Sequence, residues 1–431
     1  MTVRNQKLRC LCIRKHNIFQ KQISRFDICR SEISGLRVYR SRNTATVALS
    51  DILAFTISIF AEIYDRKDHM DMEQENRQGS SQTPHRRRPH YSGNHPRTYA
   101  EKYKEQNPEK YPETIEKVIA KGSTPAGMHL PIAVQEILDV LKIQPGESGL
   151  DCTLGYGGHT RKLLKALGDS GHLTALDVDS ENLVRTEKML RAEGYGESRL
   201  SILHLNFRDI DQAAAQYGPF DFVLADLGVS SMQIDEPERG FSWKHEGPLD
   251  LRLDPAGGVT AAERLAELDR EELAGLLAEN SDEPYAEEIA SAVHRKLKHG
   301  EKIETTTQLS AVVEEAVSAA MQKEGRKKAE IAEMAKKSCS RTFQALRIDI
   351  NQEFESLGLL LDKLPEVLSP GGRAAILTFH SGEDRLVKKQ FREAYREGRY
   401  QKIAEDVIRP SREECIRNPR AKSAKLRWAI R

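Results

Sequence analysis

The stretch Asp151-Cys152-Thr153-Leu154-Gly155-Tyr156-Gly157-Gly158-His159-Thr160 is the most informative part of the chain. It lies between a short apolar run, 149–154, and an amphipathic run, 160–167, which predicts a strand, a glycine loop and a helix. Glycines in such a loop permit a tight turn and let backbone N–H groups approach a ligand closely. We therefore expect Gly155, Gly157 and Gly158 to form one wall of a ligand site.

Two carboxylates flank this loop. Asp177 ends the next predicted strand, 22 residues after Gly155, where a carboxylate can accept hydrogen bonds from ribose hydroxyls. Asp151, before the loop, is more typical of S-adenosylmethionine (SAM) sites. The dinucleotide fingerprint requires Gly or Ala where Thr160 stands, and the absence of a following G-K-[ST] excludes a P-loop. The alternative is a tight turn that binds nothing.

Strands and helices alternate on both sides of the loop. Strands are expected at 149–154, 172–178, 200–205 and 220–226, separated by helices at 160–167, 180–193 and 209–217, after a helix at 132–141. This order predicts a parallel sheet covered by helices on both faces. Phe207, just after the third strand, is a candidate for stacking on adenine. Asp226, at the carboxyl end of the fourth strand, stands where open sheets bind ligands.

The alternation stops at 236 and resumes near 340. Between them only helices are expected, at 261–277, 285–297, 307–323 and 329–337. The later elements are a helix at 343–364, a strand at 373–379, a helix at 383–397 and two strands near 401–408 and 424–430. We therefore expect a helical domain inserted into one α/β domain, with the late strands as an antiparallel hairpin at the sheet edge.

Composition limits the class of protein. The 431 residues are 30% charged and 39% hydrophobic, a globular profile that excludes a wholly disordered chain, a collagen-like fibre and a multi-pass membrane protein. The six cysteines form no C-x-x-C pair, so neither a disulfide scaffold nor a zinc site of usual spacing is expected, and no metal is assigned. The net charge of +1 combines two basic ends, 1–97 and 385–431, with an acidic middle. Basic ends of this kind can contact a polyanion.

The N-terminal region has a different character. The apolar stretch 47–64 is too short, and too interrupted by Asp51 and Glu62, to predict a membrane span, so no stable membrane association is expected. Residues 72–97 have the composition of a disordered basic arm. A mitochondrial-type leader stays open as an alternative, as does translation from Met70 or Met72.

Five long motifs then resemble one family. They are DCTLGYGGHT, ADLGVSSMQIDEPERGFSWKHEGPLDLRLDP, RTFQALRIDINQE, FHSGEDRLVKKQF and NPRAKSAKLR, in an order that also matches. The chain from about Met128 onward is similar to the RsmH/MraW family of SAM-dependent methyltransferases, which modify the N4 amine of a cytosine in small-subunit ribosomal RNA. The resemblance implies a Rossmann-like class I SAM-dependent methyltransferase domain with an inserted all-helical domain.

The resemblance also implies site residues. Gly157, Gly158 and His159 match the family's cofactor loop, Asp177 its ribose carboxylate and Phe207 its adenine contact. Asp226 and Gln233 match further cofactor-pocket positions. With the loop residues Asp151 and Gly155 they form the predicted SAM site. Asp226 is also a candidate to orient or polarise the amine, and His380 is a second catalytic candidate for which a hydrogen-bonding role in the loop is the alternative.

The expected organisation has five parts. They are an extension (1–97), a helical linker (98–127), a first methyltransferase segment (128–235), a helical substrate-recognition insert (236–339) and a second methyltransferase segment (340–431). The expected partner is small-subunit rRNA or the small ribosomal subunit, and the expected location is the cytoplasm. The insert and the basic C-terminal segment are expected to bind the RNA backbone. The oligomeric state is open, and a homodimer is one possibility.

Gly382 departs from the family pattern, which usually has leucine there, and this leaves room for a paralogue that modifies another RNA cytosine. Two further functions stay open, a non-catalytic RNA-binding factor of ribosome assembly and an NAD-linked oxidoreductase. The intact loop and Asp226 argue against the non-catalytic factor, and Thr160 argues against the oxidoreductase.

Overall fold

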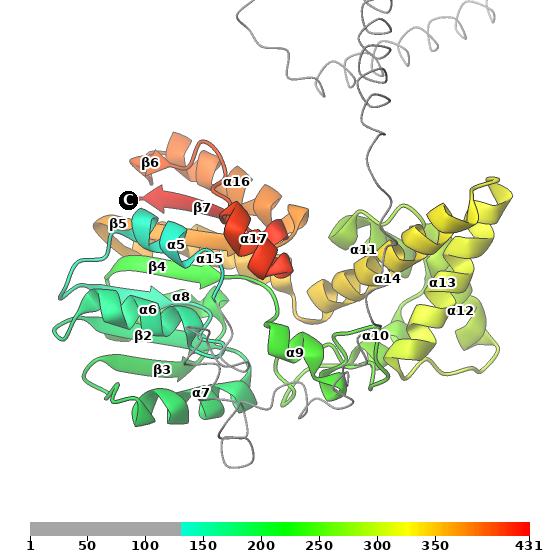
Figure 1. Ribbon diagram of the computed structural model, residues 1–431, viewed down its shortest axis with the longest axis horizontal. Helices are drawn as coiled ribbons and strands as arrows, with labels where there is room; N and C mark the ends of the chain where they lie inside the picture. Colours follow the sequence, from blue (N-terminus) through cyan, green and yellow to red (C-terminus); the bar gives the residue numbers. More distant parts are fainter. Residues whose placement is uncertain (1–130) are drawn as a thin grey trace, which may run out of the picture. The chain divides into compact units, whose positions relative to one another are not determined.

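The computed structural model describes residues 131–431 (Figure 1). The expected extension, 1–97, and linker, 98–127, lie outside the described residues, as does the apolar stretch 47–64. Among the helices of 131–431, none is both long and apolar enough to cross a membrane.

Seven strands form one sheet in the order β3-β2-β1-β4-β5-β7-β6. They are β1 (Ser148–Asp151), β2 (His172–Asp177), β3 (Leu200–His204), β4 (Phe220–Asp226), β5 (Leu368–Thr378), β6 (Lys402–Ile403) and β7 (Lys425–Ile430). Strands β1 to β5 pair in parallel, whereas β7 runs antiparallel to both β5 and β6. The two late strands therefore pair as predicted, but the second lies between the fifth strand and the first of the pair.

Helices cover both faces of the sheet (Figure 1). One face packs against α5 (Val134–Leu141), α6 (Gly158–Leu167) and α7 (Ser180–Ala192), and the other against α8 (Ile210–Tyr217), α15 (Glu353–Val367) and α16 (Ser381–Arg396). The middle of β4, residues 222–225, is a continuous apolar run because both faces of the sheet are covered there. The arrangement confirms the predicted Rossmann-like α/β class.

A helical segment interrupts this domain between β4 and β5. It comprises α9 (Ser231–Asp235), α10 (Ala261–Glu267), α11 (Arg270–Ser281), α12 (Ala286–Lys298), α13 (Thr306–Lys323) and α14 (Lys328–Ile350). Helices α10 to α14 bury a core of their own, to which Leu277, Ile289, Val313 and Leu346 belong. The inserted helical element of the predicted fold is therefore present.

Three predicted helices have different bounds in the structure. The helix expected at 261–277 is two helices, because Asp269 forms a capping box with Glu272 and starts α11. The predicted helices 329–337 and 343–364 overlap one continuous helix, α14, which ends at Ile350, and Gln352 follows with φ 49° in the left-handed region. Helix α14 thus runs through the expected domain boundary at 339–340, because its buried side chains, such as Cys339 and Phe343, continue the insert's core.

Helix α17 (Arg412–Arg417) and the short 3-10 helix η4 (Pro419–Ser423) connect β6 to β7. Glu414 of α17 accepts a hydrogen bond from the backbone N–H of Ala133, 2.9 Å away. This contact ties the basic C-terminal segment to the chain just before α5.

Candidate functional site

A cavity of about 480 Å³ lies at the carboxyl ends of the central strands. Of the predicted site residues, eight line it: Gly155, Gly158, His159, Asp177, Phe207, Asp226, Gln233 and His380. The helical insert contributes Trp243, Phe343 and Arg347 to the opposite wall. The cavity therefore combines the glycine loop with residues far along the chain.

The glycine loop has the predicted strand-turn-helix geometry. Gly155 and Gly157 have φ values of 49° and 72°, which L side chains rarely adopt, and Gly157 is the N-cap of α6. Gly157 lies outside the cavity lining, since a Cβ there would meet Thr186 and Leu190 at 3.3 Å. Its contribution is therefore the close packing of α6 on α7, not a surface for the ligand.

Asp151 is buried behind the loop and does not line the cavity. Its carboxylate accepts hydrogen bonds from Thr160 Oγ1 at 2.7 Å and from the Thr153 N–H at 3.1 Å. Thr153 Oγ1 in turn accepts from the Asp226 N–H at 2.8 Å. Burial raises the pKa of Asp151 to about 6, although these hydrogen bonds and the charge of His159 lower it. Asp151 therefore holds the loop and the end of β4 together.

Asp177 stands at the end of β2 and faces the cavity. Its oxygens accept hydrogen bonds from the Gly155 N–H at 2.7 Å and the Asp179 N–H at 2.9 Å. Burial raises the pKa of Asp177 to about 6, against those backbone hydrogen bonds. Asn182, in the first turn of α7, also lines the cavity, and its buried Oδ1 has no hydrogen-bond partner within the described residues. The sequence reasoning missed Asn182, which carries no motif of its own.

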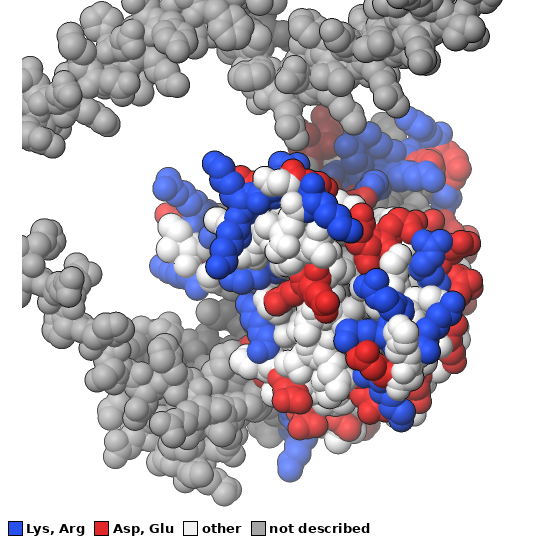
Figure 2. All heavy atoms as spheres, turned by 90° about the vertical axis from the view of Figure 1, so that its right-hand side faces the viewer, with Lys and Arg blue, Asp and Glu red and all other residues white. Residues whose placement is uncertain are grey.

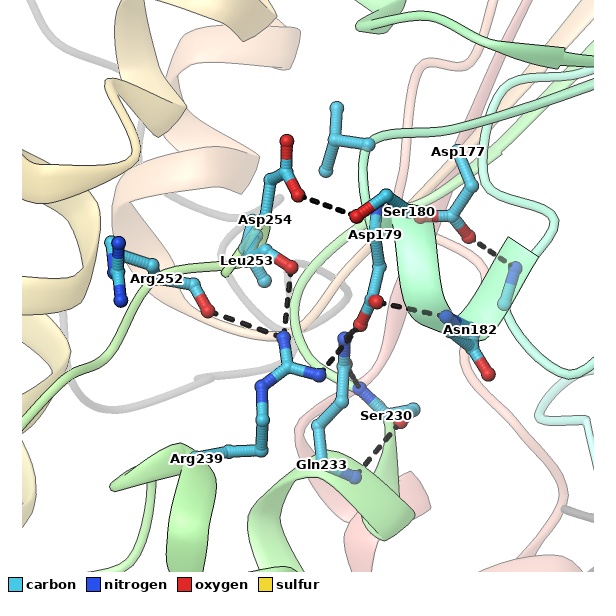
Figure 3. A network of polar contacts seen from close by, with 12 residues as sticks. Asp177, Asp179, Ser180, Asn182, Ser230, Gln233, Arg239, Arg252, Leu253 and Asp254 are labelled. Carbon is cyan, nitrogen blue, oxygen red and sulfur yellow. Dashed lines mark hydrogen bonds and ion pairs between the residues drawn. The ribbon is translucent and has the colours of Figure 1, made fainter. Parts of the chain in front are cut away.

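Gln233 belongs to a polar network between α7 and the insert (Figure 3). Gln233 Nε2 and Arg239 Nη1 donate to the same Asp179 oxygen, at 2.8 and 2.9 Å. Arg239 also donates to the Leu253 carbonyl at 2.8 Å, and Ser180 donates to Asp254 at 2.8 Å. Asp179 is 1% exposed, so the network is a buried link between the cofactor side of the sheet and the loop that precedes α10.

Buried His159 pairs with half-buried Asp226 beside the loop. His159 Nδ1 lies 3.2 Å from Asp226 Oδ2, and His159 Nε2 lies 3.0 Å from the Ile132 carbonyl oxygen. The second carboxylate oxygen, Asp226 Oδ1, is buried and has no hydrogen-bond partner in the described part of the chain. Asp226 thus presents one unsatisfied acceptor in a cavity-lining residue, which is a position for a ligand donor.

The opposite wall carries a second charged group. Arg347 donates two hydrogen bonds to Glu353, at 2.7 and 2.8 Å. Glu383 accepts from the Phe379 N–H at 2.8 Å, and His380 Nδ1 caps α16 by accepting from the Glu383 N–H at 3.4 Å. One potential metal-ligand atom each from Glu353, His380 and Glu383 lie within 4.8 Å of one another. Arg347 and backbone amides already form hydrogen bonds with these residues. His380 therefore caps the helix through Nδ1, and its Nε2 lies 3.1 Å from Glu383 Oε1.

The residues present fit a nucleoside cofactor with an amino-acid end. Asp177 and Asn182 offer acceptors for hydroxyl groups, half-buried Phe207 offers an aromatic face, and the loop offers space beside its backbone. The cavity volume lies within the range of small-ligand pockets, about 300–1,000 Å³.

Comparison with known proteins decides the family, because the model of the MraW methylase family matches residues 126–431. The chain belongs to the MraW methylase family. It is 58% identical over 347 residues to "Ribosomal RNA small subunit methyltransferase H 1" of Lachnoclostridium phytofermentans, covering 80% of this chain and 93% of the relative. A protein of the same name from Agathobacter rectalis is 55% identical over 352 residues, covering 82% of this chain and 99% of the relative.

Among solved structures, a putative rRNA-methylase from Clostridium thermocellum matches with a TM-score of 0.33 and 13% identity, over 70% of this chain and 97% of that chain. The chain is a methyltransferase, and its cofactor is S-adenosylmethionine. The family match ends at the last residue of the chain and begins just before the described part, so it spans both the sheet domain and the helical insert.

Proposed function

We propose that this enzyme methylates the exocyclic N4 amine of a cytosine in the decoding region of small-subunit rRNA. The observation that carries the proposal is Asp226 Oδ1, a buried acceptor without a partner among the described residues, in the same cavity as the cofactor loop. An amine has hydrogens to donate to such an acceptor, whereas a ring carbon has none. The names of the relatives support the small-subunit rRNA as the substrate class.

The cytosine amine is a weak nucleophile because its lone pair is delocalised into the ring. SAM, when bound, supplies a methyl group on a sulfonium, so the N–CH₃ bond forms as the C–S bond breaks and sulfur keeps the electron pair. The protein's task is then to orient the amine, which Asp226 Oδ1 would do by accepting a hydrogen bond from it. The methylated nitrogen must then lose one proton, and the same oxygen would receive it. Positioning of this kind lowers barriers substantially in water-excluded sites. A catalytic role for His380 stays a prediction.

The opposite wall suits a base taken out of its stack. Trp243 and Phe343 supply aromatic surface, and both line the cavity. Two guanidinium nitrogens of Arg347 are engaged by Glu353, while Nη1 has no hydrogen bond within the described residues. A fixed donor of this kind matches the N3 and O2 acceptors on the Watson–Crick edge of cytosine.

We assign binding of the RNA backbone to the C-terminal segment, 385–431. Four exposed basic residues there make no ion pair within the described part of the chain: Arg409, Arg412, Arg417 and Lys422. Arg420, from the same segment, lines the cavity. The insert, 236–339, holds 15 Lys and Arg against 22 Asp and Glu, and Figure 2 shows both signs interspersed on the face it views. Phosphate binding requires an excess of positive charge, which favours the C-terminal segment.

The five-part organisation is proposed with it, the insert (236–339) serving substrate recognition between two methyltransferase segments (128–235 and 340–431). Helix α14 continues the insert beyond the second boundary, to Ile350. This substrate implies that the enzyme acts in the cytoplasm. The alternative is a paralogue that methylates a different RNA cytosine. Gly382, where the family pattern has leucine, is the observation that favours it.

Transfer of a labelled methyl group from SAM to small ribosomal subunits tests the proposal. We expect incorporation of one methyl group per subunit and a large loss of rate in Asp226→Asn, which keeps the shape of the side chain. Its control, Glu333→Gln, changes an exposed carboxylate of the insert and should leave the rate unchanged. Unchanged transfer by Asp226→Asn would contradict the role given to Asp226.

A further inference from the structure

His159 lies between two oxygen atoms, a backbone carbonyl oxygen and a carboxylate oxygen, and each faces one nitrogen of its ring. Nε2 is 3.0 Å from the Ile132 carbonyl oxygen, and Nδ1 is 3.2 Å from Asp226 Oδ2. The residue is 6% exposed, so water cannot replace either partner freely. The protonation state of the ring therefore follows from what these two oxygens can accept or donate.

A carbonyl oxygen only accepts hydrogen bonds, so Nε2 must carry a hydrogen. A neutral imidazole has a single N–H, which would leave the Nδ1 lone pair facing a carboxylate oxygen at 3.2 Å. Two lone pairs at that distance repel each other, and burial prevents solvent from screening them. A second hydrogen, on Nδ1, turns the repulsion into a charge-assisted hydrogen bond.

The charges around the ring favour that second hydrogen. The charged groups that act on His159 are Asp226, at the end of β4, and Asp151, on β1, and both are acidic. Burial alone would lower the pKa of His159, but the charge and hydrogen bond of Asp226 and the charge of Asp151 outweigh it and raise the pKa above its ordinary value. From the described residues before α5, 131–133, the ring contacts the Ile132 carbonyl, whose position is secured by the bond from Ala133 N–H to Glu414.

We infer that His159 is an imidazolium that acts as a positioning residue for Asp226, fixing Oδ2 while Oδ1 stays free for the substrate amine. In this arrangement the cation cancels the charge of a carboxylate that would otherwise be buried beside Asp151. His159 thus acts through Asp226 and not as a cofactor contact alone. The inference rests on the proposed function only for the identity of the amine.

Nitrogen NMR of the full chain labelled with ¹⁵N-histidine tests the charge without RNA. At pH 7.5 we expect both ring nitrogens of His159 to carry hydrogens. In Asp226→Asn, which keeps the side chain's shape, we expect the neutral ring with its hydrogen on Nε2 alone, because the Asn amide can donate to Nδ1. A neutral His159 in the wild type, or an imidazolium that persists in Asp226→Asn, would overturn the inference.

Two substitutions separate the two contacts of the ring in kinetics. The His159→Asn amide can take the place of Nδ1 and still donate to Asp226, whereas the His159→Gln amide reaches toward Ile132 and leaves Asp226 without a donor. We expect kcat to fall about tenfold to a hundredfold in His159→Gln and less in His159→Asn, since hydrogen bonds to charged groups are worth about 1.5–3 kcal/mol.

A decrease of kcat at high pH that follows deprotonation of His159 should be absent in His159→Gln, because the Gln amide does not titrate. His299→Gln, at an exposed position in the insert, is the control and should change neither kcat nor its pH dependence. Equal kcat values and pH profiles for wild type and His159→Gln would overturn the inference. A wild type that methylates no rRNA would instead contradict the proposed function, and the NMR result would still decide the charge of His159.

Discussion

At the scale of single residues, Gly382 shows how one departure from a family pattern is compensated. A Cβ at Gly382 would lie 2.6 Å from the Phe354 ring and 3.2 Å from His380 Nδ1. The space that a side chain at 382 would need is thus filled by Phe354, whose ring also lies 5.7 Å from that of His380. The first turn of α16 is therefore well packed although a glycine stands at 382.

We expect Gly382→Leu to lower the free energy of unfolding by about 1–3 kcal/mol, because overpacking displaces Phe354. The double variant Gly382→Leu with Phe354→Ala should recover part of that loss, since the ring that clashes is gone. Chemical denaturation of the single variants and the double variant measures both effects. Additive losses in the double variant would show that the two positions do not share one space.

The raised pKa of Asp177, about 6, leads to a pH dependence of cofactor binding. Ribose hydroxyls donate to the ionised carboxylate, so affinity should increase as pH rises from about 5 through 6 to 7 and then level off. The stability of the free protein should change with pH in the opposite direction. A carboxyl group whose pKa is raised by folding stabilises the folded state at low pH, and this contribution is lost as pH rises from about 4 to 6.

Calorimetric titration with S-adenosylhomocysteine at several pH values measures the first effect. Asp177→Asn should bind more weakly and lose most of the dependence near pH 6, leaving the smaller contribution of Asp151, whose pKa is also raised to about 6. An Asp177→Asn variant with the full wild-type pH dependence would show that the carboxylate does not face the ribose.

At the scale of elements, the network around Asp179 links α7, α9 and the loop before α10 (Figure 3). Arg239 supplies the opposite charge, and the side chains of Arg239 and Asp179 are 11% and 1% exposed. Removing one member of a buried pair leaves the other charge without a partner. We expect Arg239→Ala to lower the free energy of unfolding by about 3–5 kcal/mol. The variant should also bind the cofactor more weakly, because Asp179 precedes α7, whose first turn lines the cavity through Asn182.

The matched control is Lys337→Ala, which breaks the exposed pair with Glu333 on α14. Surface pairs of this type contribute about 0.3–0.5 kcal/mol, so its effect should be small. Thermal unfolding of both variants, with and without S-adenosylhomocysteine, gives the comparison. Equal losses in the two variants would contradict the structural role of the network.

Much of the fold was predictable at this scale, for physical reasons. Strand β4 carries a continuous apolar run at 222–225, and helices such as α6 and α7 bury regularly spaced apolar residues, so local pattern and burial agree. The break at Asp269 was missed because the apolar period continues across it and only the capping box reveals it. The turn at Gln352 was missed because a left-handed non-glycine residue has no sequence signal.

The site was predictable to a similar degree. Residues at strand ends, such as Asp177 and Asp226, reach the cavity because parallel strands end at one edge of the sheet. Arg347 and Trp243 were missed because they reach the cavity from the insert, through packing that no local pattern specifies. Asp151 and Gly157 were also expected in the site, but neither lines the cavity: Asp151 lies behind the loop, and Gly157 lets α6 pack closely on α7.

At the scale of the whole molecule, charge is distributed unevenly, with an excess of Lys and Arg over Asp and Glu in residues 385–431. We expect the double variant Arg412→Ala, Arg417→Ala to bind small subunits more weakly and with a salt dependence lower by about two counterions, since each phosphate contact contributes about one. The control, Lys327→Ala with Lys328→Ala, removes two exposed charges from the insert and should change binding little. A larger loss of affinity in the control would show that the insert, and not the C-terminal segment, binds the RNA backbone.

The identity of the methylated nucleoside tests the central claim most directly. Small ribosomal subunits that lack the modification are incubated with the enzyme and SAM, the rRNA is digested to nucleosides, and the products are separated and identified by mass spectrometry. The account predicts N4-methylcytidine, at a single cytosine in the decoding region when fragments are mapped, and its loss in Asp226→Asn. A methyl group on a ring carbon, on a ribose or on a ribosomal protein would contradict it.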